Sequence, residues 1–328
     1  MNETPSSAAS TFGPDRRRVM GALALTGAAL PFAAGCSTAR AGEAAATRGV
    51  AMVSPPYLDP LFNVSAMARL AGDLDPSGVG RVHYSGRAFG VAPGEPVRPL
   101  YGIEGLGSNR IQSMADGTQR FMFAEFAVYT DLETGEPLTQ WTNPYTNETL
   151  PVWHQRNGPV NFALSPAMNA FGAFDAVDDA PAFRLPWVEV GDYSSFALDV
   201  TSNRPNALSP EDWPRESTGE TLHISEHSTY FVKTADLVDA RLTSLPFHAA
   251  LQSNKPWHPW MMMGRRPGKV FARLSARKVP GLDALPPKVA AYARANLADY
   301  LEPATEFTKQ YRTAYAIYKE TMKARPMG

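Results

Sequence analysis

The chain has 328 residues, of which 44% are hydrophobic and 19% charged, a composition typical of a globular protein and unlike that of a disordered one. Its 31 Lys and Arg residues nearly balance its 32 Asp and Glu residues, so the net charge of -1 gives no reason to expect nucleic acid as a partner.

A secretory signal is predicted at the N-terminus. Residues 15–20 read Asp-Arg-Arg-Arg-Val-Met, and an uncharged run rich in Ala, Gly and Leu extends from Val19 to Cys36. Basic residues before an apolar stretch with a small-residue ending have the layout of a signal peptide, and paired arginines are typical of its twin-arginine variant. The run is too short and too rich in Ala and Gly for a membrane span. We therefore expect the twin-arginine translocase to export the protein, already folded, to the periplasm or cell envelope.

The end of this signal allows two forms of processing. Ala33-Ala-Gly-Cys36 resembles a lipobox, at which a Cys is lipidated, although Ala33 stands where Leu is usual. Lipidation of Cys36 would anchor the protein at a membrane surface, whereas cleavage after Ala39 or Ala41 would discard it. Cys36 is the only cysteine, which excludes an internal disulfide. We expect a signal at 1–36, a flexible tether at 37–56, and one β-rich domain at 57–328.

Strands dominate the prediction between Arg81 and Val279. Thr118 to Tyr129 is followed by a turn in which Gly135 can adopt a positive φ, and Leu138 to Trp141 is the expected partner strand. Many short strands without helical periodicity between them predict a mainly β fold, an antiparallel barrel or sandwich, and argue against a parallel α/β sheet. Further strands are expected at 81–91, 97–103, 109–114, 181–190, 193–201, 220–232, 243–251 and 269–278.

The C-terminal segment, at about 284–325, has helical spacing instead. Pro286-Pro287 is a suitable start for a first helix. A second helix is expected after Pro303, with an aromatic stripe that includes Tyr311, Tyr315 and Tyr318. We expect both helices to pack on the β domain.

Several segments resemble an uncharacterised bacterial family of twin-arginine-exported proteins that is known only as a domain of unknown function. They are Tyr129-Thr-Asp-Leu-Glu-Thr-Gly-Glu, Trp141-Thr-Asn-Pro-Tyr-Thr, Trp257-His-Pro-Trp, Gly264-Arg-Arg-Pro-Gly and Ser275-Ala-Arg-Lys-Val-Pro-Gly-Leu-Asp. The resemblance covers most of the chain after the tether and implies a single domain. It brings no activity and no catalytic residue.

His223-Ile-Ser-Glu-His227 fits the H-x-x-E-H motif of inverted zincins, in which two His side chains bind zinc beside a general-base Glu. On a helix the two His residues lie roughly 6 Å apart, but on a strand they lie roughly 13 Å apart, too far to share one zinc. The β-branched and aromatic neighbours predict a strand. The zinc site is therefore a minor alternative, and no metal is expected.

On a strand, His223 and His227 share a polar face that points either to solvent or into a polar cavity. Glu226 lies on the opposite, more apolar face, where burial would raise its pKa toward the range useful for acid/base chemistry. We select all three residues as candidates for proton transfer.

Three other groups could contribute to a site. Glu125 and Tyr129 share one face of a strand with two phenylalanines, which would suit proton transfer in an aromatic pocket. The segment around Gly158-Pro159 is expected to be a loop rich in hydrogen-bonding groups. A Trp- and Met-rich segment after Asn254 would form either a ligand-binding wall or a plug. The candidates in the last two segments are Trp153, His154, Asn157, Asn161, Trp257, His258 and Trp260.

Phosphate-binding and dinucleotide-binding glycine motifs, a nucleophile elbow and paired cysteines are absent from the sequence, so no cofactor is expected. The leading hypothesis is a cofactor-independent lyase, isomerase or hydrolase that acts on a small apolar or aromatic molecule by acid/base chemistry. A non-catalytic ligand-binding lipoprotein and a zinc-dependent hydrolase are the alternatives. The sequence leaves open whether the protein is an enzyme.

Overall fold

The computed structural model of the protein describes residues 54–167 and 182–323. The predicted signal and nearly all of the predicted tether lie outside the described residues. Within these ranges, no helix has both the length and the apolar character needed to cross a lipid bilayer.

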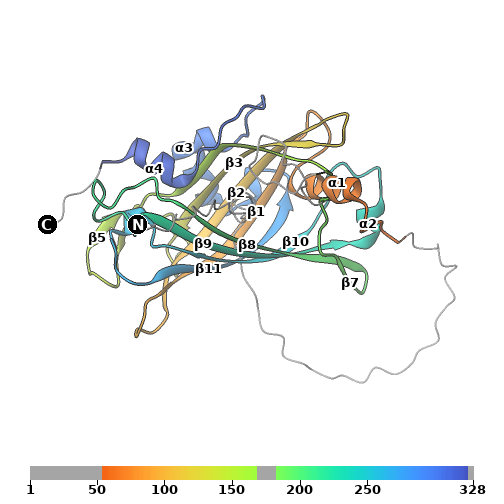
Figure 1. Ribbon diagram of the computed structural model, residues 1–328. Coiled ribbons are helices and arrows are strands. Elements are labelled where there is room, and N and C mark those ends of the chain that lie inside the picture. Colours follow the sequence, from red (N-terminus) through yellow and green to blue (C-terminus); the bar gives the residue numbers. More distant parts are fainter. Residues whose placement is uncertain (1–53, 168–181, 324–328) are drawn as a thin grey trace, which may run out of the picture.

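The predicted mainly β fold is confirmed, because the described residues form one nine-stranded antiparallel sheet that curls into a half-barrel (Figure 1). The strand order is β6-β3-β2-β1-β11-β10-β9-β8-β7, and β4 pairs with β5 in a separate hairpin. The strands are β1 (Gly80–Val91), β2 (Arg98–Ser113), β3 (Gln119–Thr130), β4 (Gln140–Thr142), β5 (Thr149–Pro151), β6 (Gln155–Leu164), β7 (Val188–Val190), β8 (Tyr193–Pro205), β9 (Thr221–Lys233), β10 (His248–Lys255) and β11 (Lys269–Val279).

The sheet consists of two antiparallel meanders joined at their centre. One meander runs from β1 through β2 and β3 to β6, and the other from β7 through β8, β9 and β10 to β11. β1 then pairs with β11 along its length, with Arg81 opposite Val279 and Val91 opposite Lys269. Because the sheet curls, strands from its two halves face each other across its inner side.

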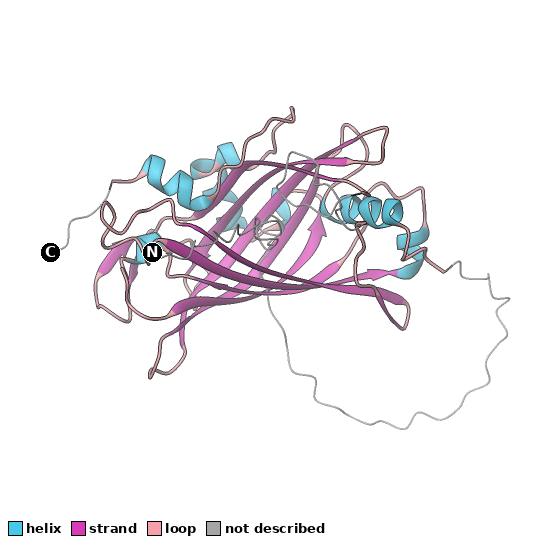
Figure 2. Cartoon of the chain, in the orientation of Figure 1, coloured by secondary structure: helices cyan, strands magenta, loops and turns pink. Residues whose placement is uncertain are grey.

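Helices occupy the ends and one outer region of this sheet (Figure 2). α1 and α4 lie at opposite ends of the curl in Figure 1 and pack into the core of the inner face. α3 covers the outer face of β2 and β3, where Leu106, Phe126 and Val128 form a second, smaller core with it. The helices are α1 (Pro60–Ala71), α2 (Thr234–Val238), α3 (Pro287–Asn296) and α4 (Ala314–Thr321), with short 3₁₀ turns η1 (Pro259–Met261), η2 (Leu282–Ala284) and η3 (Ala298–Tyr300).

The C-terminal segment differs from its prediction in one respect. The first predicted helix is present as α3, but the second begins only at Ala314. Before it, the chain is extended beside β6, where Tyr311 forms a bridge with Val160. The amide of Asn161 donates to the Gln310 carbonyl, and that of Arg312 to the Pro159 carbonyl. Pairing with the exposed edge of β6 therefore takes precedence over helical periodicity in this segment.

Candidate functional site

A cavity of about 90 Å³ lies on the inner face of the sheet, between its two halves and beneath the C-terminal segment. β3 and β6 provide one wall, β8, β9 and β10 the opposite wall, and the segment from Tyr311 to Tyr318 the cover. The side chains that line it are Phe123, Glu125, Tyr129, Trp153, Gln155, Asn157, Val160, Ser202, Arg204, Ile224, Glu226, Lys255, His258, Pro259, Trp260, Tyr311, Thr313, Ala314, Tyr315 and Tyr318.

Glu125 projects from β3 into this cavity and is hydrogen-bonded through both of its oxygens. The Tyr84 hydroxyl donates to Oε1 at 2.7 Å, and Asn157 Nδ2 donates to Oε2 at 2.6 Å. Burial raises the pKa of Glu125, while the hydrogen bonds and the nearby Lys255 ammonium act in the opposite direction. The net shift of the pKa is upward, so the carboxyl group loses its proton at a higher pH than an exposed Glu does.

A glycine on β2 allows Tyr84 to reach Glu125. Tyr84 lies on β1 opposite Gly105, which in turn lies opposite Ala127 on β3. A Cβ at Gly105 would lie 2.1 Å from the Tyr84 ring. The missing side chain therefore lets the phenol cross a whole strand and donate to a carboxyl group two strands away.

Glu226 and Lys255 form an ion pair on the opposite wall. Lys255 Nζ lies 2.9 Å from Glu226 Oε1, and the two side chains are only 16% and 5% exposed. β9 and β10 point these side chains inward because both alternate residue by residue between the buried and the solvent-facing side. The cavity thus contains a shielded charge pair, in which electrostatic interactions are stronger than at a surface.

Aromatic rings pack closely at one end of the cavity. Tyr129 stacks on His258 with ring centroids 5.5 Å apart, and Trp260 lies 5.6 Å from the same phenol ring. Burial raises the pKa of the Tyr129 hydroxyl, which stays protonated. Burial also lowers the pKa of His258 to about 3, so this imidazole is neutral at physiological pH. Both rings can therefore act as neutral hydrogen-bond donors.

Asn157 connects the cover to the site. Its Oδ1 accepts the amide hydrogen of Ala314, the first residue of α4, at 2.7 Å, while its Nδ2 donates to Glu125. That amide belongs to the first turn of a helix, which has no acceptor within the helix. One amide side chain therefore fixes both the orientation of the carboxyl group and the start of the covering helix.

The structure brings seven of the twelve sequence-predicted catalytic and binding residues to this cavity and leaves five elsewhere. Those at the cavity are Glu125, Tyr129, Trp153, Asn157, Glu226, His258 and Trp260. His223 and His227 are exposed on the outer face of β9, where they pair with Asn203 and Asp199. His154, Asn161 and Trp257 are buried but do not line the cavity. Cys36 lies outside the described residues.

The H-x-x-E-H segment lies entirely on β9. The two His side chains share its outer face, and Glu226 occupies the inner face. The described residues contain no group of three or more His, Cys, Asp and Glu side chains arranged to hold a metal ion. This geometry does not favour the zinc hydrolase alternative, because the glutamate points away from both imidazoles.

Sequence reasoning missed several residues of the site, including Tyr84, Arg204, Gln155, Lys255 and Tyr315. Tyr84 and Tyr315 resemble any core aromatic in the sequence, and their role depends on the curl of the sheet. Lys255 lies beyond the strand expected at 243–251, but it continues the alternation of that strand. A lysine at an inward position needs a buried partner, so it was the more detectable residue.

A family model described as "Protein of unknown function (DUF1838)" matches residues 81–322. The chain belongs to this family. The match spans the sheet from the second residue of β1 onward, together with α3 and the whole segment from Tyr311 to Tyr318 that covers the cavity. No curated protein matches the sequence significantly.

Proposed function

We propose that the protein acts on a small apolar or aromatic molecule by cofactor-independent acid/base chemistry, as a lyase, isomerase or hydrolase. One observation carries the proposal: titratable side chains from separate strands meet in a single aromatic-walled cavity, namely Glu125, Tyr129, Glu226 and Lys255. Burying such groups costs free energy, so their convergence on a cavity supports the proposal of a functional site there.

The cavity offers a distinct role to each of these groups. Glu125 is the proposed general base, since a raised pKa brings a carboxylate closer to the proton affinity that acid/base catalysis requires. Tyr129, held protonated, would donate a hydrogen bond to negative charge that develops on the substrate. Lys255 would stabilise the same charge, and the rings of Trp260 and Tyr315 would bind the apolar part of the substrate.

The test is turnover of a library of small aromatic compounds by the purified protein, followed by mass spectrometry. We expect Glu125→Gln to reduce the rate by about 10²- to 10⁴-fold, the usual contribution of general acid/base catalysis. His227→Ala is the matched control and should leave the rate unchanged, because His227 is exposed on the outer face. Equal rates for wild type and Glu125→Gln would refute the assigned base.

A non-catalytic ligand-binding role is the second candidate, and one feature of the site favours it. Both oxygens of Glu125 already accept hydrogen bonds, and Lys255 already pairs with Glu226. Groups engaged in this way can shape a binding cavity without exchanging protons. Saturable binding of a library compound that is never converted to product would support this role over catalysis.

We also propose that the protein functions in the periplasm or cell envelope after twin-arginine export, with Cys36 as a lipid anchor. The support is the order of basic, apolar and small residues at the N-terminus and the position of the single cysteine.

A further inference from the structure

A second, larger hollow of about 410 Å³, the vestibule, lies beside the cavity. It is lined by Thr201, Thr218, Thr221, His223, Ile224, Ser225, Asn254, Lys255, Pro256, Arg265, Arg266, Pro267, Gly268 and Lys269. Two of these residues, Ile224 and Lys255, also line the cavity. The two hollows therefore share a wall made of an isoleucine and a lysine side chain.

The vestibule forms where two neighbouring strands separate. The pairing of β9 with β10 ends at Ser225 opposite Asn254, although β9 continues to Thr221 in contact with β8. β10 instead ends beside β11, with Lys255 opposite Val270. Residues 221–224 consequently have no strand on their β10 side. The split in the sheet opens at the level of the buried Glu226–Lys255 pair.

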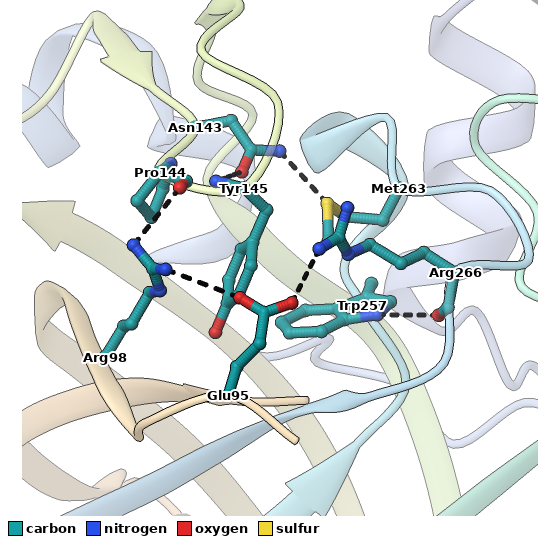
Figure 3. A network of polar contacts seen from close by, with 8 residues as sticks. All are labelled: Glu95, Arg98, Asn143, Pro144, Tyr145, Trp257, Met263 and Arg266. Atoms are coloured by element: carbon teal, nitrogen blue, oxygen red, sulfur yellow. Dashed lines mark hydrogen bonds and ion pairs between the residues drawn. The ribbon is translucent and has the colours of Figure 1, made fainter. Parts of the chain in front are cut away.

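The loop of residues 265–268 forms the far side of the vestibule, and the network in Figure 3 holds it in place. Glu95 accepts hydrogen bonds from both Arg98 and Arg266, and both guanidinium groups lie 5.3 Å from the centre of the Tyr145 ring. Trp257 donates from Nε1 to the Arg266 carbonyl at 3.0 Å. This network fixes the loop against the β1–β2 connection and gives Arg266 an acidic partner, which it shares with Arg98.

The remaining charge of the vestibule is positive. Of its four lysine and arginine side chains, Lys255 pairs with Glu226 and Arg266 with Glu95. The side chains of Arg265 and Lys269 are exposed and form no hydrogen bond or ion pair with any described residue. No acidic side chain lines this hollow in the described part of the chain. Inside the cavity, the Arg204 side chain is likewise without an ion pair among the described residues.

We infer that the substrate or ligand of this site is an apolar or aromatic carboxylate, which enters through the vestibule. The inference rests on the proposed function, because it assigns a ligand class to the same cavity. Arg265 and Lys269 would attract the anion to the split between β9 and β10, since a concave surface of one charge concentrates ions of the opposite sign. Its carboxylate would remain near Lys255 while its apolar part enters the aromatic cavity.

The test measures equilibrium dissociation constants for matched pairs of probes by calorimetry. The pairs are benzoate with benzamide, phenylacetate with phenylacetamide, cinnamate with cinnamamide, and 2-naphthoate with 2-naphthamide. We expect the carboxylate of at least one pair to bind roughly tenfold more tightly than its amide, with an affinity that falls as NaCl is raised.

The test variant carries two substitutions, Arg265→Gln and Lys269→Gln. The control variant also carries two, Arg273→Gln and Arg277→Gln. Both pairs are exposed, but the control pair lies on β11 outside the vestibule. We expect the test variant to lose about tenfold in carboxylate affinity and nothing in amide affinity, while the control retains both. Thermal unfolding of each variant verifies that it is folded.

Equal binding of carboxylates and amides, loss of affinity in the control, or no binding of any probe would overturn the inference. These outcomes remain distinct from failure of the proposed function. Glu125-dependent turnover of neutral compounds without a carboxylate preference would leave the function intact and remove the ligand class. Carboxylate binding that requires Arg265 and Lys269 but gives no turnover would leave the ligand class intact and remove the proposed catalytic function.

Discussion

At the scale of single residues, the site depends on effects that act on the pKa of Glu125 in opposite directions. Burial raises the pKa of Glu125, and the hydrogen bonds from Tyr84 and Asn157 lower it. Each hydrogen bond to a charged group contributes about 1.5–3 kcal/mol. The residues that position these donors are therefore as important to the chemistry as the carboxyl group itself.

Gly105 is the most informative of these positioning residues. We expect Gly105→Ala to displace the Tyr84 ring, break its hydrogen bond to Glu125 and destabilise the protein by about 1–3 kcal/mol, as overpacking generally does. Urea unfolding measures the loss of stability. The pH dependence of ligand binding should also shift upward, because a carboxyl group with fewer donors binds its proton more tightly.

Gly281→Ala provides the control for that substitution. A Cβ at Gly281 would meet nothing within 4 Å, and its φ of 179° is ordinary extended backbone. Gly281→Ala should therefore leave both the stability of the protein and the pH dependence of ligand binding at the wild-type level. A Gly105→Ala variant with an unchanged pH profile would show that Tyr84 does not control the protonation of Glu125.

At the scale of elements, Lys278 stabilises the end of α1. Its Nζ donates to the carbonyl oxygens of Arg69 and Gly72 at the C-terminus of that helix. Burial lowers the pKa of Lys278 to about 7, and the attraction of Asp73 offsets this only in part. A neutral amine still has two hydrogens for the two carbonyl groups.

This arrangement predicts how stability depends on pH. Between about pH 7 and the ordinary lysine pKa of about 10.4, the unfolded chain binds a proton that the folded protein releases, so stability should rise with pH in this window. Urea unfolding should show this rise for wild type and a smaller one for Lys278→Met. Lys288→Met, at an exposed lysine on α3, is the control and should keep the wild-type slope. Parallel slopes for wild type and Lys278→Met would contradict the assignment.

The elements also show what local sequence patterns can and cannot reveal. β1, β3, β8, β9 and β11 were predicted because alternation and turn residues are local signals. The two strands expected at 97–103 and 109–114 form one strand, β2. The prediction divided it because the glycines within β2 interrupt the sequence pattern of a continuous strand. Gly158-Pro159 predicts a loop in the segment from Trp153 to Asn161, yet most of this segment belongs to β6. Proline is tolerated there because β6 is the edge strand of the sheet.

Part of the candidate site was also predicted from the alternation of residues along strands. Glu125, Tyr129 and Glu226 were found because strand alternation places them on faces that a fold buries. Alternation does not show which side of a strand is the inner one, so the histidines of β9 remained candidates although they face outward. Lys255 and Arg204 were missed, because only the curled sheet brings β8 and β10 opposite β3.

At the scale of the whole molecule, the order of the strands bears on how the protein reaches its compartment. The first long strand, β1, pairs with the last, β11, so the two meanders join only when the strands at both ends of residues 80–279 are present. Pairings between strands so distant in sequence form slowly. Export in the folded state, as in the proposed twin-arginine route, would let this pairing form in the cytoplasm.

Replacement of the signal arginines tests this proposal. We expect the triple substitution Arg16→Lys, Arg17→Lys and Arg18→Lys to keep the full-length protein in the cytoplasm, because it preserves the positive charge but removes the paired arginines that the receptor recognises. Fractionation and immunoblotting measure the distribution. Arg40→Lys, in the predicted tether, is the control and should be exported as wild type. Unchanged export of the triple variant would contradict the twin-arginine route, since a general signal requires only basic charge before its apolar run.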